Sequence, residues 1–167
     1  MRPPQCGRPT PKIKTTMQNL KILNKKEIKE ILGMIEKQWD AKLSLDYAFL
    51  KNDKGKIFIV NKDISKIDSS KLRINSIGMY FSEIRNNELR LSMEGSQIAG
   101  PKAKKKILEL DEEQLKEWML GIDLEMQGDF EGFFLIKHKE DFIGCGKWRS
   151  NKVLNYINKA RRINVIS

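Results

Sequence analysis

The amino-acid sequence predicts an α+β protein of two small domains, because helix and strand patterns occur in both halves of the chain. The first half has a helical stripe of apolar residues and two strand pairs, and the second has a capped helix and a hairpin. Gly100-Pro101, followed by a run of lysines, is the best boundary, since Gly and Pro interrupt regular structure. We therefore expect a small α/β domain at 17–100 and a second domain at 101–167.

The pattern after Leu23 is helical. Asn24 and Glu27 have the spacing of a capping box, and the apolar residues that follow fall at helical spacing: Ile28, Ile31, Leu32, Ile35 and Trp39. We interpret this stripe as the side of the helix that faces the core. The next patterns predict a hairpin at 45–61 about residues 52–55, a short helix or turn at 63–70, two strands at 72–93 about residues 85–88, and a short helix at 96–99.

The second half begins with a short strand, a helix and its stop at 107–121. Asp111 can accept hydrogen bonds from the first free helix amides, and Gln114 can reach back to it, as in a capping box. Trp118 falls on the apolar side of this helix, together with Leu115 and Met119. Gly121 suits a left-handed C-terminal cap.

Two apolar runs joined by a polar tip predict a hairpin at 132–148. Gly144 and Gly146 bracket Cys145, so alternate positions on one face of the second strand lack a side chain. A backbone or a partner molecule could approach closely there.

The composition is that of an ordinary globular chain, with 40% apolar and 32% charged residues. No apolar run approaches the roughly 18 residues that span a membrane, and no signal peptide is apparent, so we expect a cytoplasmic protein with no membrane partner. Cys6, Cys145 and His138 are too few and too scattered to predict a disulfide or a zinc site. No cofactor or metal is indicated.

The net charge of +10 favours a polyanionic partner, and the charges are sorted along the chain. Residues 102–106 carry four positive charges and no negative ones. Residues 107–131 hold nine acids against one lysine, and six basic residues without an acid follow from position 147 onward. Two interpretations stay open: an acidic helix start with a solvated basic tail, or a domain with a basic nucleic-acid face and an acidic back.

Residues 1–16 differ from the rest of the chain, with four prolines, four basic residues and no acids. A segment of this composition cannot bury enough apolar surface to fold, so we expect a disordered basic leader. Met17 as the natural start of the protein, and a basic arm that contacts RNA, are the two alternatives for this segment.

The search for catalytic residues finds no site. We interpret His138, on a polar hairpin tip, as a solvated loop histidine, and Cys145, between glycines on a strand, as a buried structural thiol. Gly144-Cys145-Gly146 lacks the third glycine and the helix of a dinucleotide fingerprint, and neither a P-loop nor an HExxH helix is present. The helix macrodipole already explains the acids Glu112 and Glu113. We therefore expect a protein that is not an enzyme.

The order of elements at 107–125 and 132–148, a strand, an acidic helix ending in Gly and a hairpin carrying Gly-x-Gly, resembles a PUA domain. This RNA-binding module is named for pseudouridine synthases and archaeosine transglycosylases. The preceding segment 76–104 resembles the lead-in to the PUA domain in a narrower group. That group comprises nucleolar pre-ribosome-processing factors with a pre-PUA domain, their archaeal counterparts, and the RNA-binding appendage of Nop/Sun-type rRNA cytosine methyltransferases.

The resemblance implies a pseudo-barrel for 101–167, a pre-PUA domain before it, and RNA as the ligand. It places RNA near the lysines that precede the helix, the glycine loop and the last strands. Together with the basic residues from position 147 onward and the glycines of the hairpin, this gives the candidate RNA-binding residues Lys102, Lys105, Lys106, Gly121, Gly144, Gly146, Lys147, Arg149, Lys152, Arg161 and Arg162. The acidic helix departs from the pattern, since its exposed face cannot hold phosphates. Trp148 is either a core residue or a base-stacking platform.

We therefore predict a non-catalytic RNA-binding protein that acts on rRNA, pre-rRNA or a tRNA-like structured RNA, in rRNA processing, ribosome biogenesis or RNA modification. The alternative is a protein-interaction subunit, whose acidic region 109–131 binds a ribosome-assembly or RNA-modifying protein. The cofactor motifs and paired cysteines of the methyltransferase catalytic domain are absent, so a methyltransferase would work with this chain in trans.

Overall fold

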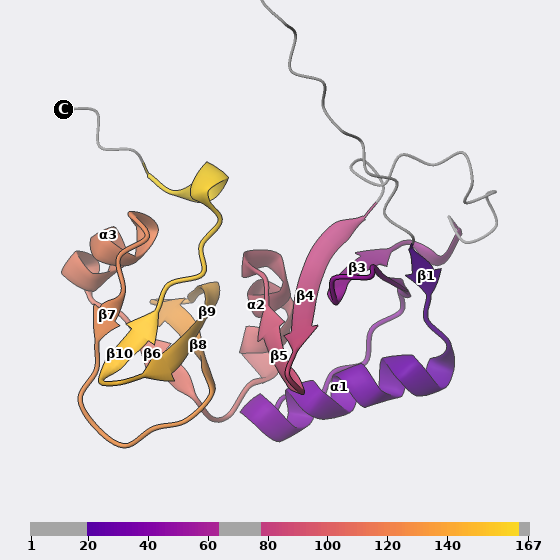
Figure 1. Ribbon diagram of the computed structural model, residues 1–167, viewed down its shortest axis with the longest axis horizontal. Coiled ribbons are helices and arrows are strands. Elements are labelled where there is room, and N and C mark those ends of the chain that lie inside the picture. The colour runs from indigo at the N-terminus through magenta and orange to yellow at the C-terminus, as the bar shows by residue number, and fades with distance from the viewer. Residues whose placement is uncertain (1–19, 64–77, 164–167) are drawn as a thin grey trace, which may run out of the picture.

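The computed structural model describes residues 20–63 and 78–163 of the 167 (Figure 1). The predicted leader at 1–16 and the predicted short helix or turn at 63–70, apart from Asp63, lie outside the described residues. None of the described helices is long and apolar enough to cross a membrane.

The first helix, α1 (Lys25–Trp39), forms as predicted. Its capping box is complete: the Asn24 side chain accepts a hydrogen bond from the Glu27 amide at 3.0 Å, and the Glu27 carboxylate accepts one from the Asn24 amide at 2.9 Å. Three residues of the predicted stripe are buried, Ile31, Ile35 and Trp39. The apolar spacing therefore marks the side of α1 that packs on the first sheet.

The first sheet is an antiparallel meander whose strands lie in chain order, β1 (Lys21–Ile22), β2 (Ala48–Lys51), β3 (Lys56–Val60), β4 (Met79–Arg85) and β5 (Glu88–Leu91). Both predicted hairpins are confirmed, with turns at 52–55 and 86–87. The predicted short helix at 96–99 is longer, α2 (Met93–Ala99), and a 3₁₀ turn at Gly100–Lys102 follows it. One face of this sheet packs on α1, which lies below it in Figure 1.

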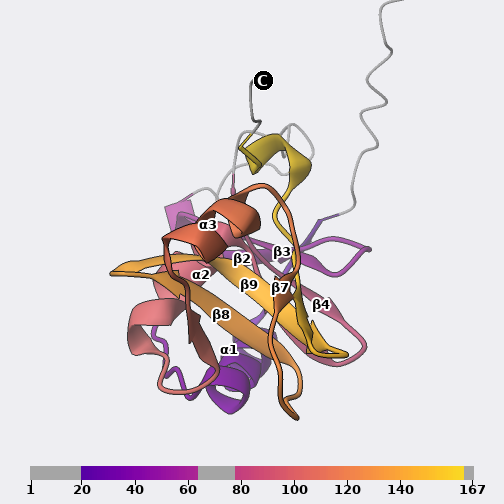
Figure 2. The ribbon, with the colours of Figure 1, turned by 90° about the vertical axis from the view of Figure 1, so that its left-hand side faces the viewer.

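The second sheet contains β6 (Ile107–Glu109), β7 (Leu124–Glu125), β8 (Phe133–His138), β9 (Asp141–Arg149) and β10 (Lys152–Leu154), in the order β6-β8-β9-β10-β7. β6 and β8 are parallel, and the other pairs are antiparallel. Helix α3 (Glu112–Met119) lies beside one end of this twisted sheet (Figure 2), and a 3₁₀ turn at Lys159–Arg161 ends the described chain. The predicted α+β class is confirmed, and the curled sheet is consistent with a PUA pseudo-barrel.

Both ends of α3 follow the prediction. Asp111 and Gln114 form the capping box, since the Gln114 amide donates to Asp111 at 2.8 Å and the Asp111 amide to Gln114 at 3.1 Å. Gly121 has φ +88°. Its amide donates to Trp118 O and the Ile122 amide to Glu117 O, both at 3.0 Å, which is the hydrogen-bond pair of a Schellman motif.

The space over the hairpin glycines is filled from within the protein. Gly144, Cys145 and Gly146 are buried, and a Cβ atom on Gly146 would lie 2.7 Å from the ring of Trp118 and 2.5 Å from Val153. A backbone does approach Gly146 closely, since a Cβ atom there would lie 2.9 Å from Leu154 O, and Trp118 of α3 lies over both glycines. That a partner molecule also approaches them stays a prediction. Sequence spacing revealed the gap but not which residue fills it.

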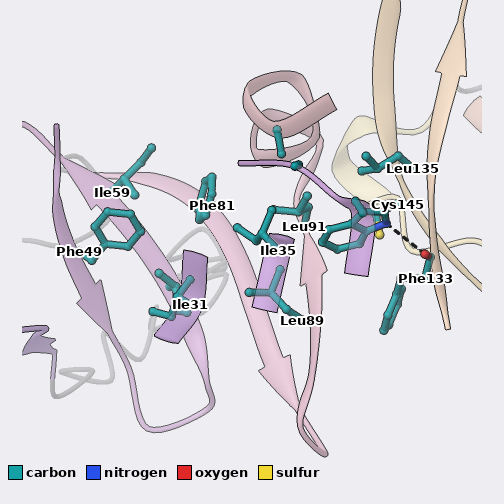
Figure 3. Packing of buried hydrophobic residues seen from close by; sticks show 14 of the residues in the cluster. Ile31, Ile35, Phe49, Ile59, Phe81, Leu89, Leu91, Phe133, Leu135 and Cys145 are labelled. Carbon is teal, nitrogen blue, oxygen red and sulfur yellow. Dashed lines mark hydrogen bonds between the residues drawn. The ribbon is translucent and has the colours of Figure 1, made fainter. Parts of the chain in front are cut away.

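The two halves share a core (Figure 3). Phe133, Leu135 and Cys145 of the second sheet pack in one cluster with Ile35, Phe81 and Leu91 of the first half. The indole N–H of the fully buried Trp39 donates to Phe133 O at 3.1 Å, the hydrogen bond drawn in Figure 3. The two sheets lie on either side of Gly100-Pro101, but the division into domains at 100/101 stays a prediction.

Candidate nucleic-acid interface

Strand register brings part of the predicted site to one end of the second sheet. β6 and β8 are parallel with Ile107 opposite Leu135, so both strands begin at this end, and Lys106 Nζ donates to Glu131 O at 2.9 Å. β9 is antiparallel to β8, so Arg149 ends there, and Lys152 lies opposite Arg149 at the start of β10. We call this group the lysine edge: Lys102, Lys104, Lys105, Lys106, Arg149 and Lys152.

Three of the remaining predicted residues lie at the opposite end of the same sheet. Gly121 precedes β7, and Arg161 and Arg162 follow β10 (top of Figure 1). The amide of Ile163 donates to Met119 O at 2.9 Å, which holds this segment against the end of α3. We call Gly121, Arg161 and Arg162 the C-terminal edge. The basic residues that the sequence predicts as one RNA-binding surface are thus divided between the two ends of the second sheet.

The lysine run is held by its backbone. The amides of Lys104 and Lys105 both donate to Trp39 O, the last residue of α1, at 2.9 and 3.3 Å. The side chains of Lys102, Lys104 and Lys105 are exposed, and none of them makes an ion pair with another described residue. Three ammonium groups therefore lack a counter-charge within the described ranges, and two of them belong to a backbone that Trp39 anchors.

The other cations of the lysine edge are held to different degrees. Arg149 is exposed and, within the described ranges, has no ion pair. Lys152 Nζ lies 3.4 Å from Glu125 Oε1 on the surface, a pair that contributes little. Lys106 is half-buried and bonded to Glu131 O. Arg149 is therefore the strand residue best placed to join the three lysines.

Lys147 and the C-terminal arginines are engaged within the protein. Lys147 pairs with Glu88 of β5, and its Nζ lies 5.4 Å from the ring centre of Phe133. Arg161 pairs with Glu94 of α2. Arg162 Nε donates to Ile157 O at 3.2 Å, and its side chain packs over Gly121. Three of the predicted RNA contacts therefore already hold structural partners.

Trp148 has features of both interpretations, a core residue and a base-stacking platform. It is half-buried beside the second core cluster, and its indole N–H donates to Met126 O at 3.1 Å. Its ring meets Phe130 edge-on with 6.1 Å between ring centres, and Phe130 is 39% exposed. The sequence analysis did not single out Phe130, because a lone aromatic in an acidic loop carries no pattern.

The sequence analysis also missed two cations beside the lysine edge. Lys37 and Lys42 are exposed and flank Trp39, whose carbonyl holds Lys104 and Lys105. Only the folded chain brings the end of α1 next to residues 102–106. The signal in the sequence, two lysines around a helix end, is too common to be specific.

The catalytic search has mixed outcomes. Cys145 is buried, as predicted, and burial raises the pKa of its thiol to about 12. His138 is not a solvated loop residue, because its side chain is 13% exposed, its Nδ1 bonds Leu110 O at 2.8 Å, and its Nε2 lies 3.4 Å from Glu112. No group of three His, Cys, Asp or Glu side chains in the described residues could hold a metal ion.

The acidic face of α3 keeps its charge. Glu113 and Glu117 are exposed, and the hydrogen bond from Lys139 lowers the pKa of the Glu112 carboxyl below its usual value. Phosphates are repelled from this face. The structure therefore separates the anionic helix from the cations of the lysine edge.

Comparisons with known proteins match this part of the chain. Residues 105–163 match the family described as the methyltransferase RsmF PUA domain. The resemblance to a PUA domain is confirmed. The matched segment includes the second sheet, from β6 to β10, and the 3₁₀ turn that follows it.

Three relatives are each named ribosomal RNA small subunit methyltransferase F. The one from Vibrio vulnificus (strain YJ016) is 26% identical over 84 residues, 50% of this chain and 18% of that protein. The one from Vibrio parahaemolyticus serotype O3:K6 (strain RIMD 2210633) is 26% identical over 153 residues, 87% of this chain and 32% of that protein. The one from Aeromonas salmonicida (strain A449) is 30% identical over 86 residues, 51% of this chain and 18% of that protein.

These relatives confirm the resemblance to the appendage of rRNA methyltransferases and correct one prediction. The prediction that the protein is not an enzyme is wrong, because the proteins it matches are named as methyltransferases. The absence of catalytic motifs was poor ground for that prediction, since the chain spans only 18–32% of the length of the relatives described above.

Proposed function

We propose that this chain binds small-subunit ribosomal RNA through the lysine edge and thereby supports rRNA methylation. The observation that carries the proposal is the set of exposed ammonium groups of Lys102, Lys104 and Lys105, which have no counter-charge in the described structure. The backbone amides of Lys104 and Lys105 are anchored to Trp39 O. Arg149 adds a fourth cation at the same end of the second sheet.

Such an edge suits the phosphates of a folded RNA. Lysine side chains provide affinity that falls with salt, because each bound phosphate releases condensed counterions. These contacts position the RNA without reading its bases. The relatives are named for small-subunit ribosomal RNA, which favours it over tRNA-like RNA as the ligand.

The test compares two triple variants of the full chain. Lys102→Gln, Lys104→Gln and Lys105→Gln together remove three charges from the lysine edge. Lys25→Gln, Lys26→Gln and Lys29→Gln remove three exposed charges from the other end of α1, where the described structure gives them no ion pair. That end is roughly 20 Å away, from the rise of a helix of this length.

Binding of a small-subunit rRNA transcript is measured by fluorescence anisotropy over a range of salt concentrations. We expect the lysine-edge variant to flatten the log–log salt dependence by roughly 2 to 3, from about 0.7–0.9 per lost phosphate contact. The α1 variant should change the slope much less. Equal slopes for the two variants, with both folded, would falsify the assignment of the site.

The protein-interaction alternative stays a prediction. The exposed acids of α3 are available for a basic partner, but their charge alone does not identify one. A protein that co-purifies after nuclease treatment, and is lost on reversing Glu112, Glu113 and Glu117, would support it. Loss of that protein on nuclease treatment alone would count against it.

A further inference from the structure

The face of the first sheet that points away from α1 carries a row of partly exposed apolar residues. Strand register places Ile22, Leu50, Phe58 and Tyr80 directly opposite one another across β1 to β4. The rings of Phe58 and Tyr80 are 5.7 Å apart, and Ile22 is 50% exposed. This row crosses four strands, and none of the helices in the described part of the chain covers it as α1 covers the opposite face.

A β-bulge gives this face a second row, of charged residues. Ile57 pairs with Ser82 and Phe58 with Tyr80, so Phe81 is the extra residue, and Tyr80 and Glu83 share a face although they are three residues apart. The Tyr80 hydroxyl donates to Glu83 at 3.3 Å, and Arg90 of β5 donates to the same carboxylate at 2.6 Å. Without the bulge, alternation would turn either Tyr80 or Glu83 toward the core.

The two rows together form a strip of residues on this face: Ile22, Leu50, Phe58, Tyr80, Lys56, Glu83 and Arg90. This strip continues across the seam between the two sheets. The guanidinium of Arg90 lies 4.4 Å from the ring centre of Tyr156, which follows β10 and is 39% exposed. Tyr156 lies 5.9 Å from the ring of Phe133, and Lys147 lies over that ring. Two pairs of aromatic rings, Phe58 with Tyr80 and Tyr156 with Phe133, are therefore interspersed with cations from β3 of the first sheet to β9 of the second.

We propose that this strip binds an unpaired segment of RNA, whose bases stack on Tyr80, Tyr156 and the guanidinium of Arg90. The proposal rests on the proposed function, because it assigns a second contact to the same RNA. The lysine edge holds the phosphates of the folded RNA, and the strip receives bases that have left a helix.

Charge favours RNA over a protein partner. Three cation–ring contacts lie in the strip: Lys56 with Tyr80 at 5.5 Å, Arg90 with Tyr156, and Lys147 with Phe133. Four cations, Lys56, Arg85, Arg90 and Lys147, outnumber two acids, Glu83 and Glu88, which pair with the last three of them. Charged residues are depleted at the centre of protein–protein interfaces, whereas surfaces for single-stranded nucleic acid combine cations with aromatic rings. The strip has the second composition.

The test uses the full chain and two RNA probes, a labelled oligo-uridylate, which is unpaired, and a duplex RNA of equal length. Tyr80→Leu and Tyr156→Leu each remove a ring but keep an apolar side chain, whereas Tyr80→Phe and Tyr156→Phe keep the ring. Tyr47→Leu is the matched control, because Tyr47 is 42% exposed and lies outside the strip. Thermal melting by circular dichroism verifies that each variant is folded.

Each Leu variant should weaken binding of the oligo-uridylate by about 5-fold or more, because stacking of one base contributes about 1 kcal/mol or more. The Phe variants and Tyr47→Leu should bind within about 2-fold of the unchanged chain, since they leave the stacking rings in place. Binding of the duplex should be the same for all of them.

Unchanged oligo-uridylate binding by both folded Leu variants would overturn the inference. If the same experiment shows rRNA binding lost in the lysine-edge variant, the proposed function survives and only the strip is wrong. Failure of the unchanged chain to bind the oligo-uridylate would also overturn the inference, and failure to bind the small-subunit rRNA transcript would refute the proposed function as well. Loss of an rRNA methyltransferase from the co-purified proteins, with RNA binding intact, would make the strip a protein-docking face instead.

Discussion

The lysine edge and the C-terminal edge lie at opposite ends of one sheet and differ in the charge that they leave free. At the lysine edge, Lys102, Lys104 and Lys105 are exposed and form no ion pair with the rest of the described chain. At the C-terminal edge, Arg161 pairs with Glu94 and Arg162 bonds Ile157 O. The sequence carries cations at both ends, but only one end presents them to a ligand.

The difference shows that the number of basic residues in a sequence does not give the number of cations that can bind RNA, because some of them are already paired within the protein. A phosphate that binds Arg161 must first displace Glu94, and an exposed pair of this kind contributes up to about 1 kcal/mol. A phosphate that binds Lys102 displaces only water and counterions. The backbone that holds Lys104 and Lys105 leaves their side chains free, whereas the side chains of the C-terminal arginines are bonded within the protein.

The largest expected effect concerns the tryptophans that support the two edges. Trp39 O binds the lysine run, and Trp118 O binds the Gly121 amide and Asn155 Nδ2. Both side chains are fully buried, so Trp39→Ala and Trp118→Ala should each lower the free energy of unfolding by about 3–5 kcal/mol. Urea denaturation measures both values.

The matched Phe variants separate the roles of the two tryptophans. Trp39→Phe leaves Phe133 O without its buried donor, which costs about 1–3 kcal/mol beyond the change in packing. The indole N–H of Trp118 is buried and has no partner among the described residues, so Trp118→Phe loses no hydrogen bond. A larger loss of stability in Trp118→Phe than in Trp39→Phe would contradict the stabilising role assigned to the hydrogen bond of the Trp39 indole.

A smaller effect is expected at the glycines of the two edges. Gly121 and Gly132 have φ of +88° and +77°, so an alanine at either position costs about 1–2 kcal/mol in backbone strain. At Gly121 the new Cβ would also lie 2.7 Å from Arg162 Cδ, whereas at Gly132 only Lys106 Nζ, the far end of a long side chain, is near, at 3.3 Å. Gly121→Ala should therefore be the more destabilising in urea, by a further ~1 kcal/mol or more. Equal losses would show that Arg162 moves aside without cost.

The smallest expected effect comes from a variant that frees a cation at the C-terminal edge and so makes it more like the lysine edge. Glu94→Gln removes the counter-charge of Arg161 and should steepen the log–log salt dependence of rRNA binding by up to about 0.7–0.9, one added phosphate contact. Stability should change by less than about 1 kcal/mol. Glu30→Gln, an exposed acid on α1 with no ion pair in the described structure, controls for net charge. If both variants steepen the dependence equally, overall charge and not release of Arg161 explains it.

Local patterns in the sequence were accurate predictors of local structure. The capping boxes of α1 and α3, the positive φ at Gly121 and the hairpin turns depend on residues within a few positions of one another. The apolar stripe of α1 likewise identified its buried side, since helical period determines which residues share a face. The resemblance to a PUA domain relied on the order of these same elements.

The errors arose where distant residues meet. Gly144 and Gly146 looked open until α3 placed Trp118 over them, and His138 looked solvated until Leu110 O and Glu112 enclosed it. Lys147 and Arg161 looked free, but their acids, Glu88 and Glu94, lie far earlier in the chain. No sequence pattern within a few residues of these side chains indicates which residues they contact.

The sequence by itself therefore determined the two longer helices with their caps, the hairpins and the excess of positive charge, because backbone hydrogen bonding and side-chain period act within one or two turns. The tertiary structure alone decided which cations remain available. Register set Lys106, Arg149 and Lys152 at one end of the sheet, and Trp39 anchored the lysine run there. An ion pair forms between neighbours in space, and neighbours in space are known only after the chain has packed.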